Sequence, residues 1–212
     1  MASAGDLIAL ARRELLVKEE PSGSNRVKYN TAYYGREVSG KSYPWCVTYL
    51  WWVFRQAGLG LYRTASCTAF VEHYRRKAPE RVLKGDYRPG DIVFFDFTGK
   101  RAKTVHVGIV ERVGADGTLT TIEGNTGTLS DANGGAVMRR TRKPGLVTCG
   151  VRPSYPGTGG KAPPGLASVD VLPGGAVCRS CRTLWHGPDA VQAACRSAPT
   201  LYRSRKARMA RM

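Results

Sequence analysis

The chain has 212 residues, room for one ordinary domain and a remainder, and its hydrophobic fraction of 42% argues against disorder over the whole length. Lys and Arg number 33 against 16 Asp and Glu, which gives a net charge of +17. This charge favours an anionic partner, such as nucleic acid, an acidic membrane surface or a polyanionic cell-wall polymer. No stretch approaches the roughly 20 apolar residues of a membrane span.

The first 16 residues do not read as a signal peptide, because Asp6, Arg12, Arg13 and Glu14 interrupt the apolar run. We therefore expect synthesis in the cytoplasm without an export signal and without a transmembrane segment. The six cysteines are too few for a dense disulfide scaffold, and we expect them to be mostly reduced.

Helical spacing of apolar residues predicts three helices in the first part of the chain. They cover residues 3–18, a stretch from Trp45 to about Gly58, and residues 66–77. Residues 21–25 form a break, and the polar, aromatic residues 29–42 are predicted to form a loop packed on the body. Trp51, Trp52 and Phe54 are predicted to pack the middle helix in place.

After the turn signal at residues 88–90 the pattern changes to that of β-strands. Strands are predicted at 91–97, 105–113, 118–123, 136–141 and 146–152. Helices followed by antiparallel strands indicate an α+β fold, with N-terminal helices packed on a curved antiparallel sheet and a short basic extension at the C-terminus. We divide the chain into a domain at 1–153, a Pro/Gly linker at 154–166 and a basic tail at 167–212.

Cys46 stands at the predicted start of the middle helix, directly after Pro44 and Trp45. The positive end of a helix dipole favours a thiolate over a thiol, so this position suits a nucleophile. A buried core cysteine would fit the same stretch. The choice depends on whether a base and a group that orients the base accompany the sulfur.

His106 is the candidate base, on a strand where His106 and Gly108 face away from Val105 and Val107. The next strand ends at Glu123, and a short turn joins the two strands, so His106 and Glu123 should meet at the same end of the hairpin. Glu123 or Asn125 would then hold one ring nitrogen while the other faces the thiol. Taken alone, each residue has an ordinary interpretation. His106 would be a structural histidine, Glu123 a solvated strand end and Asn125 a turn residue.

Four short sequences resemble the CHAP family of papain-like cysteine amidohydrolases and peptidases, which is common in phage endolysins and bacterial wall hydrolases. The resemblance covers roughly residues 5–153. The sequences are Tyr43-Pro44-Trp45-Cys46, Arg88-Pro89-Gly90-Asp91-Ile92-Val93, His106-Val107-Gly108-Ile109-Val110 and Ile122-Glu123-Gly124-Asn125.

This resemblance implies that Cys46 attacks an amide or peptide carbonyl of peptidoglycan and that His106 transfers the proton. Glu123 would orient His106, with Asn125 as a second polar support. The Cys46 backbone N–H would help to hold the oxyanion, and Tyr34 and Tyr43 are candidates for a second donor. Such an enzyme would be an N-acetylmuramoyl-L-alanine amidase or an endopeptidase, reaching the wall after holin-mediated release or lysis.

Two features depart from the family pattern. Some relatives bind calcium through acidic residues ahead of the nucleophile, but residues 25–45 hold only Glu37, so neither calcium nor any other catalytic cofactor is expected. Trp45 stands where relatives often have a polar residue, so the sequence does not identify the group that donates to the oxyanion. A rival pair, Cys67 with His73, is disfavoured because a spacing of six points the two side chains to different helix faces. Cys149 is predicted to be a core residue.

The tail carries the ligand types of a structural zinc site, namely Cys178, Cys181, His186 and Cys195. The alternative is a basic extension with incidental cysteines. Residues 161–212 hold nine Lys and Arg against two acids, a charge of +7 that suits anionic wall polymers, a membrane surface or nucleic acid. A nucleic-acid-binding protein with a zinc-binding tail, and a wall-binding protein without activity, are the alternative functions.

Overall fold

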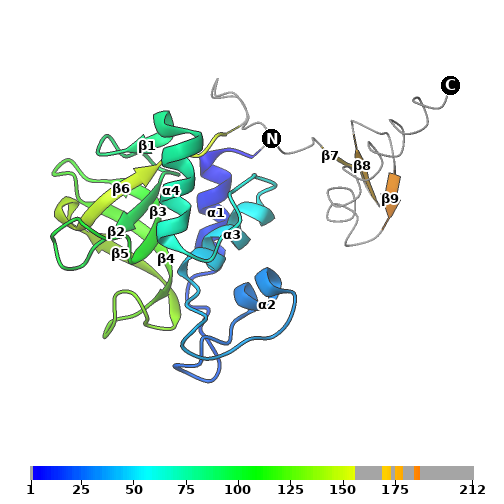
Figure 1. The fold of residues 1–212 in the computed structure, drawn as a ribbon, viewed down its shortest axis with the longest axis horizontal. Coiled ribbons are helices and arrows are strands. Elements are labelled where there is room, and N and C mark those ends of the chain that lie inside the picture. Colours follow the sequence, from blue (N-terminus) through cyan, green and yellow to red (C-terminus); the bar gives the residue numbers. More distant parts are fainter. Residues whose placement is uncertain (1, 156–168, 173–174, 179–183, 187–212) are drawn as a thin grey trace. The chain divides into compact units, whose positions relative to one another are not determined.

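The computed structural model describes residues 2–155 and, beyond them, three strands at 169–172, 175–178 and 184–186. The chain divides into two compact units, Met1–Gly160 and Lys161–Met212 (Figure 1). Within the described residues, none of the helices has the length and apolar character that crossing a membrane requires.

The first unit holds four α-helices: α1 (Ala4–Arg13), α2 (Lys28–Tyr34), α3 (Cys46–Gln56) and α4 (Cys67–Lys77). A capping box at Ser3 begins α1 as its sequence suggests. The helix ends earlier than the predicted residue 18, because Leu16 turns with a φ of 73° and donates its N–H to the Val137 carbonyl. Lys18 then pairs with Ala136, so this segment joins the sheet instead of extending the helix.

The predicted loop at 29–42 is wrong in its first part, where α2 forms. Tyr29 and Asn30 are fully buried in this helix. The Tyr29 ring packs against Trp45 and Trp52, at 5.5 and 5.3 Å between ring centroids. The Asn30 side chain donates to two backbone carbonyls, of Asn25 and Tyr43. A helix of seven residues is too short to show clear periodicity, and it is stabilised here by tertiary packing.

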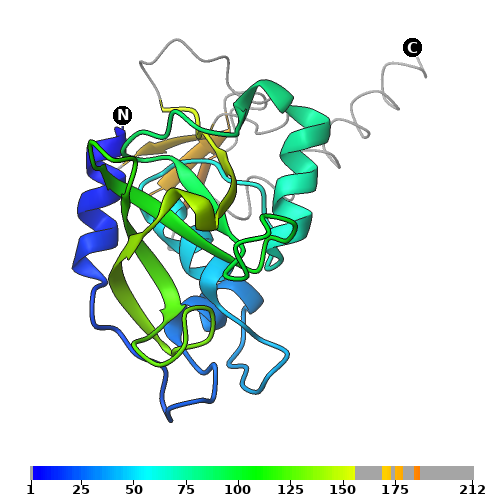
Figure 2. The same ribbon diagram turned by 90° about the vertical axis from the view of Figure 1, so that its left-hand side faces the viewer.

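A six-stranded antiparallel sheet faces the helices, with the order β1-β6-β2-β3-β4-β5 (Figures 1 and 2). The predicted α+β fold is therefore confirmed. The five predicted strands correspond to β2 through β6, whereas β1 has only two residues and was not predicted. The bounds are β1 Val82–Leu83, β2 Ile92–Phe95, β3 His106–Val113, β4 Leu119–Thr126, β5 Ala136–Arg142 and β6 Val147–Val151, with short 3₁₀ helices at Pro79–Arg81 and Pro144–Leu146.

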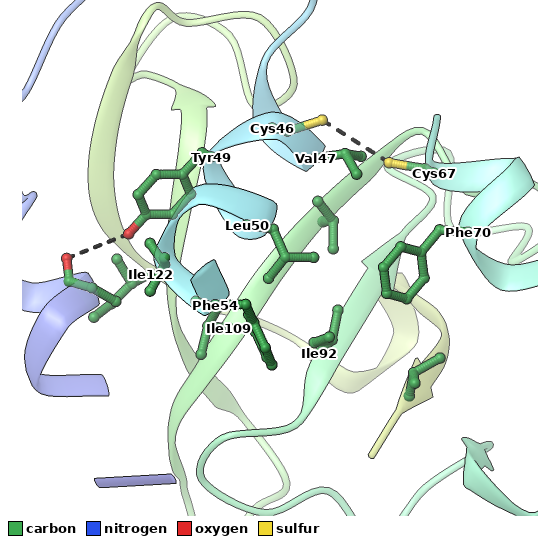
Figure 3. Packing of buried hydrophobic residues seen from close by; sticks show 14 of the residues in the cluster. Cys46, Val47, Tyr49, Leu50, Phe54, Cys67, Phe70, Ile92, Ile109 and Ile122 are labelled. Atoms are coloured by element: carbon green, nitrogen blue, oxygen red, sulfur yellow. Dashed lines mark hydrogen bonds between the residues drawn. The ribbon is translucent and has the colours of Figure 1, made fainter. Parts of the chain in front are cut away.

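The core lies between α3 and the strands β3 and β4, which the helix contacts directly. Leu50 and Phe54 point from α3 towards Ile109 and Ile122 of the sheet (Figure 3). Gly124 permits this close approach, because a Cβ atom there would lie 2.6 Å from the Tyr49 Cβ. The first turn of α3 is thereby fixed over the hairpin of β3 and β4.

The second unit contains a three-stranded antiparallel sheet of β7 (Val169–Leu172), β8 (Gly175–Cys178) and β9 (Leu184–His186). The predicted zinc ligands fall outside the residues whose side chains the structure describes. Cys178 and His186 end β8 and β9, and Cys181 and Cys195 lie outside the described ranges. The zinc site stays a prediction.

Candidate active site

Cys46 is the first residue of α3, as the sequence predicts. The residue before it, Trp45, is fully buried, and its indole N–H donates to the Glu19 carboxylate at 3.3 Å. Glu19 also accepts the backbone N–H groups of Gly23 and Asn25. Trp45 thus fixes the start of the helix, and its only side-chain donor is occupied.

His106 begins β3, opposite Phe95 of β2. Its Nε2 atom lies 3.0 Å from Oε2 of Glu123, so the structure brings together the predicted base and the predicted orienting group. Gly108 makes room for this pair, because a Cβ atom there would lie 2.8 Å from the Glu123 Cγ. The Glu123 side chain occupies the space that the missing side chain of Gly108 leaves.

Arg142, at the end of β5, was not among the predicted site residues. Its guanidinium binds both oxygens of Glu123, with Nε at 2.9 Å from Oε1 and Nη2 at 2.6 Å from Oε2. Thr121 donates a third hydrogen bond to Glu123 at 2.5 Å, and Asp131 accepts from Nη1 of Arg142 at 2.6 Å. The Arg142 group also lies over the Phe97 ring at 4.8 Å. Glu123 is therefore held from two sides, by a base and by a permanent cation.

Asn125 does not support His106 directly. It adopts a φ of 59° where the pairing of β4 with β5 is irregular, and its amide donates to the Asn133 side chain at 3.3 Å. Its Oδ1 atom is buried and has no hydrogen-bond partner among the described residues. The turn-residue interpretation fits this geometry better than contact with the imidazole ring.

The rival pair is not formed. The His73 ring stacks on Tyr62 with 3.7 Å between centroids, whereas Cys67 turns inward, and its sulfur lies 4.0 Å from the Cys46 sulfur (Figure 3). Cys149 is buried in β6 within the core, as predicted. The candidate oxyanion donors Tyr34 and Tyr43 pack against each other, with ring centroids 5.2 Å apart.

The buried groups shift one another's pKa. Burial alone would raise the pKa of Glu123, but the bonds from Arg142 and His106 lower it to about 2. Burial alone would lower the pKa of His106, yet the proximity of Cys46 and the bond to Glu123 raise it to about 9. Contact with Cys67 and the charge of His106 hold the pKa of Cys46 well below its usual range despite burial. Near neutral pH the site therefore favours a thiolate beside an imidazolium.

The Nδ1 atom of His106 is the ring nitrogen left for the sulfur. It is buried, and it makes no hydrogen bond of ordinary geometry within the described part of the chain. The exposed fraction falls from 6% at Cys46 to 0% at His106 and Glu123. A substrate would therefore approach from the side of the sulfur, with the base and its supports behind it.

These pKa shifts predict how stability depends on pH. Glu123 should contribute stability above its ordinary pKa of 4.5 that is lost as the pH falls towards 2, because its folded-state pKa is depressed. His106 should contribute stability below 6.5 that is lost as the pH rises towards 9, because its folded-state pKa is raised. Urea unfolding across this range measures both limbs. Glu123→Gln should flatten the acidic limb, and an unchanged acidic limb in that variant would contradict the assignment.

Comparison with known proteins finds a similarity over the part of the chain that holds the candidate site. Residues 38–125 match the CHAP domain model. No curated protein matches significantly. Crystal structures of Ly7917, alone and with the hydrolyzing product of MDP, share 18% identity with the chain, cover 71% of it and have TM-scores of 0.43 and 0.40. The chain spans 62% and 63% of those two chains, less than two thirds. The part of the chain that matches the CHAP domain model includes Cys46, His106 and Glu123.

Proposed function

We propose that this protein hydrolyses an amide or peptide bond of bacterial peptidoglycan through a Cys46 thiolate, in the manner of a phage endolysin. The observation that carries the proposal is the position of Cys46 at the start of α3, where its pKa and that of the Glu123-bound His106 are shifted towards an ion pair. A nucleophile, a base and an orienting carboxylate together are the requirements of a thiol hydrolase.

In the first step the Cys46 thiolate attacks the carbonyl carbon and forms a carbon–sulfur bond. The carbon–nitrogen bond then breaks, and the His106 imidazolium gives its proton to the leaving amine. In the second step neutral His106 takes a proton from water, whose oxygen attacks the thioester. The carbon–sulfur bond breaks, which gives a carboxylic acid and restores the original ion pair. The acid then loses its proton to solvent, and the amine has already been released in the first step.

The contact with Glu123 determines which ring nitrogen of His106 transfers the proton. Because Nε2 is bound to the carboxylate, Nδ1 is the atom left to exchange the proton with substrate and water. Arg142 keeps Glu123 ionised, so the carboxylate can orient and stabilise the imidazolium. The first turn of α3 supplies backbone N–H groups without intrahelical acceptors, and that of Cys46 would hold the developing oxyanion.

A cavity of about 390 Å³ lies between α4 and residues 102–105. It includes Thr68 and Val105, the neighbours of Cys67 and His106, and two cations, Arg75 and Lys103. Its full lining is Thr68, Val71, Glu72, Arg75, Ala102, Lys103, Thr104, Val105 and Thr148. A stem peptide carries free carboxylates, so the two cations and the positions of Thr68 and Val105, next in sequence to Cys67 and His106, make this cavity a suitable place for the substrate.

Lys103→Glu should therefore raise KM for wall substrate about tenfold with little change in kcat, because a carboxylate near the cavity would repel the peptide. The rate of turbidity loss at increasing wall concentration measures both constants. Lys100→Glu is the matched control, since Lys100 is exposed on the same loop but does not line the cavity. Equal effects of the two substitutions would exclude a specific role for the cavity.

The proposed activity is tested by incubating the full chain with purified bacterial walls and following turbidity and products. New amino termini on alanine that had been bound to muramic acid would identify an amidase. New termini within the stem or cross-bridge peptide would identify an endopeptidase. Intact walls after prolonged incubation with folded protein would contradict the proposal.

The basic tail is proposed to concentrate the enzyme on anionic wall polymers or a membrane surface.

A further inference from the structure

The two sulfur atoms at the site come from two helices that begin at the same place. Cys46 is the first residue of α3, and Cys67 is the first residue of α4. Their Sγ atoms lie 4.0 Å apart, and both residues are buried, with exposed fractions of 6% and 8% (Figure 3). Neither helix has an acidic residue in its first turn. The positive ends of both helices therefore act on one pair of sulfurs.

Such a pair does not easily hold two negative charges, because two thiolates in buried contact repel each other. The groups around the pair decide which sulfur loses its proton. His106 of β3 acts on Cys46, together with the Val47 N–H. At Cys67, the contact with the Cys46 sulfur and burial both oppose a second negative charge. The surroundings thus favour a thiolate at Cys46 and a neutral thiol at Cys67.

We propose that Cys67 is a positioning residue whose S–H group donates a hydrogen bond to the Cys46 thiolate. This hydrogen bond keeps the Cys46 sulfur ionised and holds its orientation. The pKa directions agree with this geometry, since the same contact lowers the pKa of Cys46 and raises the pKa of Cys67. Its consequence for catalysis rests on the proposed function, but the hydrogen bond itself is measurable without any substrate.

The test is the pH dependence of alkylation of Cys46 by iodoacetamide in the reduced, full-length protein. Mass spectrometry follows the tryptic peptide of residues 42–55, in which Cys46 is the only cysteine. Loss of a hydrogen bond to the thiolate should raise the midpoint by about one pH unit in Cys67→Ala, so this variant reacts about tenfold more slowly below the midpoint. Cys67→Ser keeps an O–H donor and should stay close to the wild-type midpoint.

Cys149→Ala is the control for removal of a buried thiol that does not touch Cys46, and it should leave the midpoint unchanged. If Cys67→Ala does not fold, Cys67→Val provides the same loss of a donor with the space filled. A midpoint in the donor-free variant equal to that of wild type, or an equal shift in Cys67→Ser, would overturn the proposal. A shifted midpoint in a protein that leaves bacterial walls intact would support the hydrogen bond and reject the wall-hydrolase function.

Discussion

Replacement of Cys46 by alanine is expected to reduce wall hydrolysis on the order of 10⁴-fold or more while the domain stays folded. The effect is large because the thiolate is the atom that forms the new bond, and the orienting groups cannot replace it. The fold should tolerate the change, because alanine suits the first turn of α3 and the surrounding core remains in place. The rate of turbidity loss on purified walls measures the effect.

Cys149→Ala is the matched control for this experiment. Cys149 is also buried, but it lies in β6. It should keep most of the wild-type rate if it folds, as judged by a cooperative thermal transition. Activity in Cys46→Ala within tenfold of wild type would contradict the assignment of the nucleophile.

Replacement of Arg142 by methionine is expected to lower the free energy of unfolding by about 3–5 kcal/mol, because it leaves the Glu123 carboxylate buried without its cation. The two side chains are 4% and 0% exposed, so solvent screens this pair little. Methionine keeps much of the aliphatic length of the arginine side chain, but it loses the contacts of the guanidinium with the rings of Phe95 and Phe97. Urea unfolding of wild type and variant measures the difference.

Arg140→Met provides a close comparison on the same strand. Arg140 also binds Asp131, at 2.7 Å, but it is more exposed and does not contact Glu123, so its loss should cost less than about 1 kcal/mol. Combining Arg142→Met with Glu123→Gln should recover part of the lost stability, because the unpaired charge is then removed. Equal costs for the two arginine substitutions would show that the bond between Arg142 and Glu123 contributes little.

The hairpin of β3 and β4 explains why the first part of the site was predictable. Alternation of apolar residues on both strands and a short turn fixed their pairing, which the observed register of Ile109 with Ile122 reflects. That pairing brings His106 and Glu123 to one end of the hairpin. Helical spacing likewise identified α3 and the position of Cys46 at its start.

Arg142 could not be identified in the same way. It is one of several basic residues in and after β5, with Arg139, Arg140 and Lys143, and nothing in their spacing marks the buried member. Its contact with Glu123 depends on the register between β4 and β5, which are joined by residues 127–135 without a clear pattern. Burial of one arginine among several is a consequence of tertiary packing that local sequence does not encode.

Cys67 shows a second limit. Helical spacing predicts the helix at residues 66–77 and relates Cys67 to His73 on that helix, but it does not place Cys67 relative to another helix. Its contact with Cys46 arises where the starts of α3 and α4 meet across the fold. Residues 57–66 connect these helices and carry no periodicity that would fix the angle between them. Such a contact becomes visible only when the helices are placed on the sheet.

The most direct test of the site is digestion of purified peptidoglycan in heavy-oxygen water by wild type and by Cys46→Ala. Thioester hydrolysis adds one oxygen atom from water to each new carboxyl group, and mass spectrometry of the released fragments locates that atom. We expect heavy oxygen at a single type of amide or peptide bond with wild type and none with the variant. The same labelled fragments from Cys46→Ala, or no labelled fragments from wild type, would contradict a thiol mechanism at Cys46.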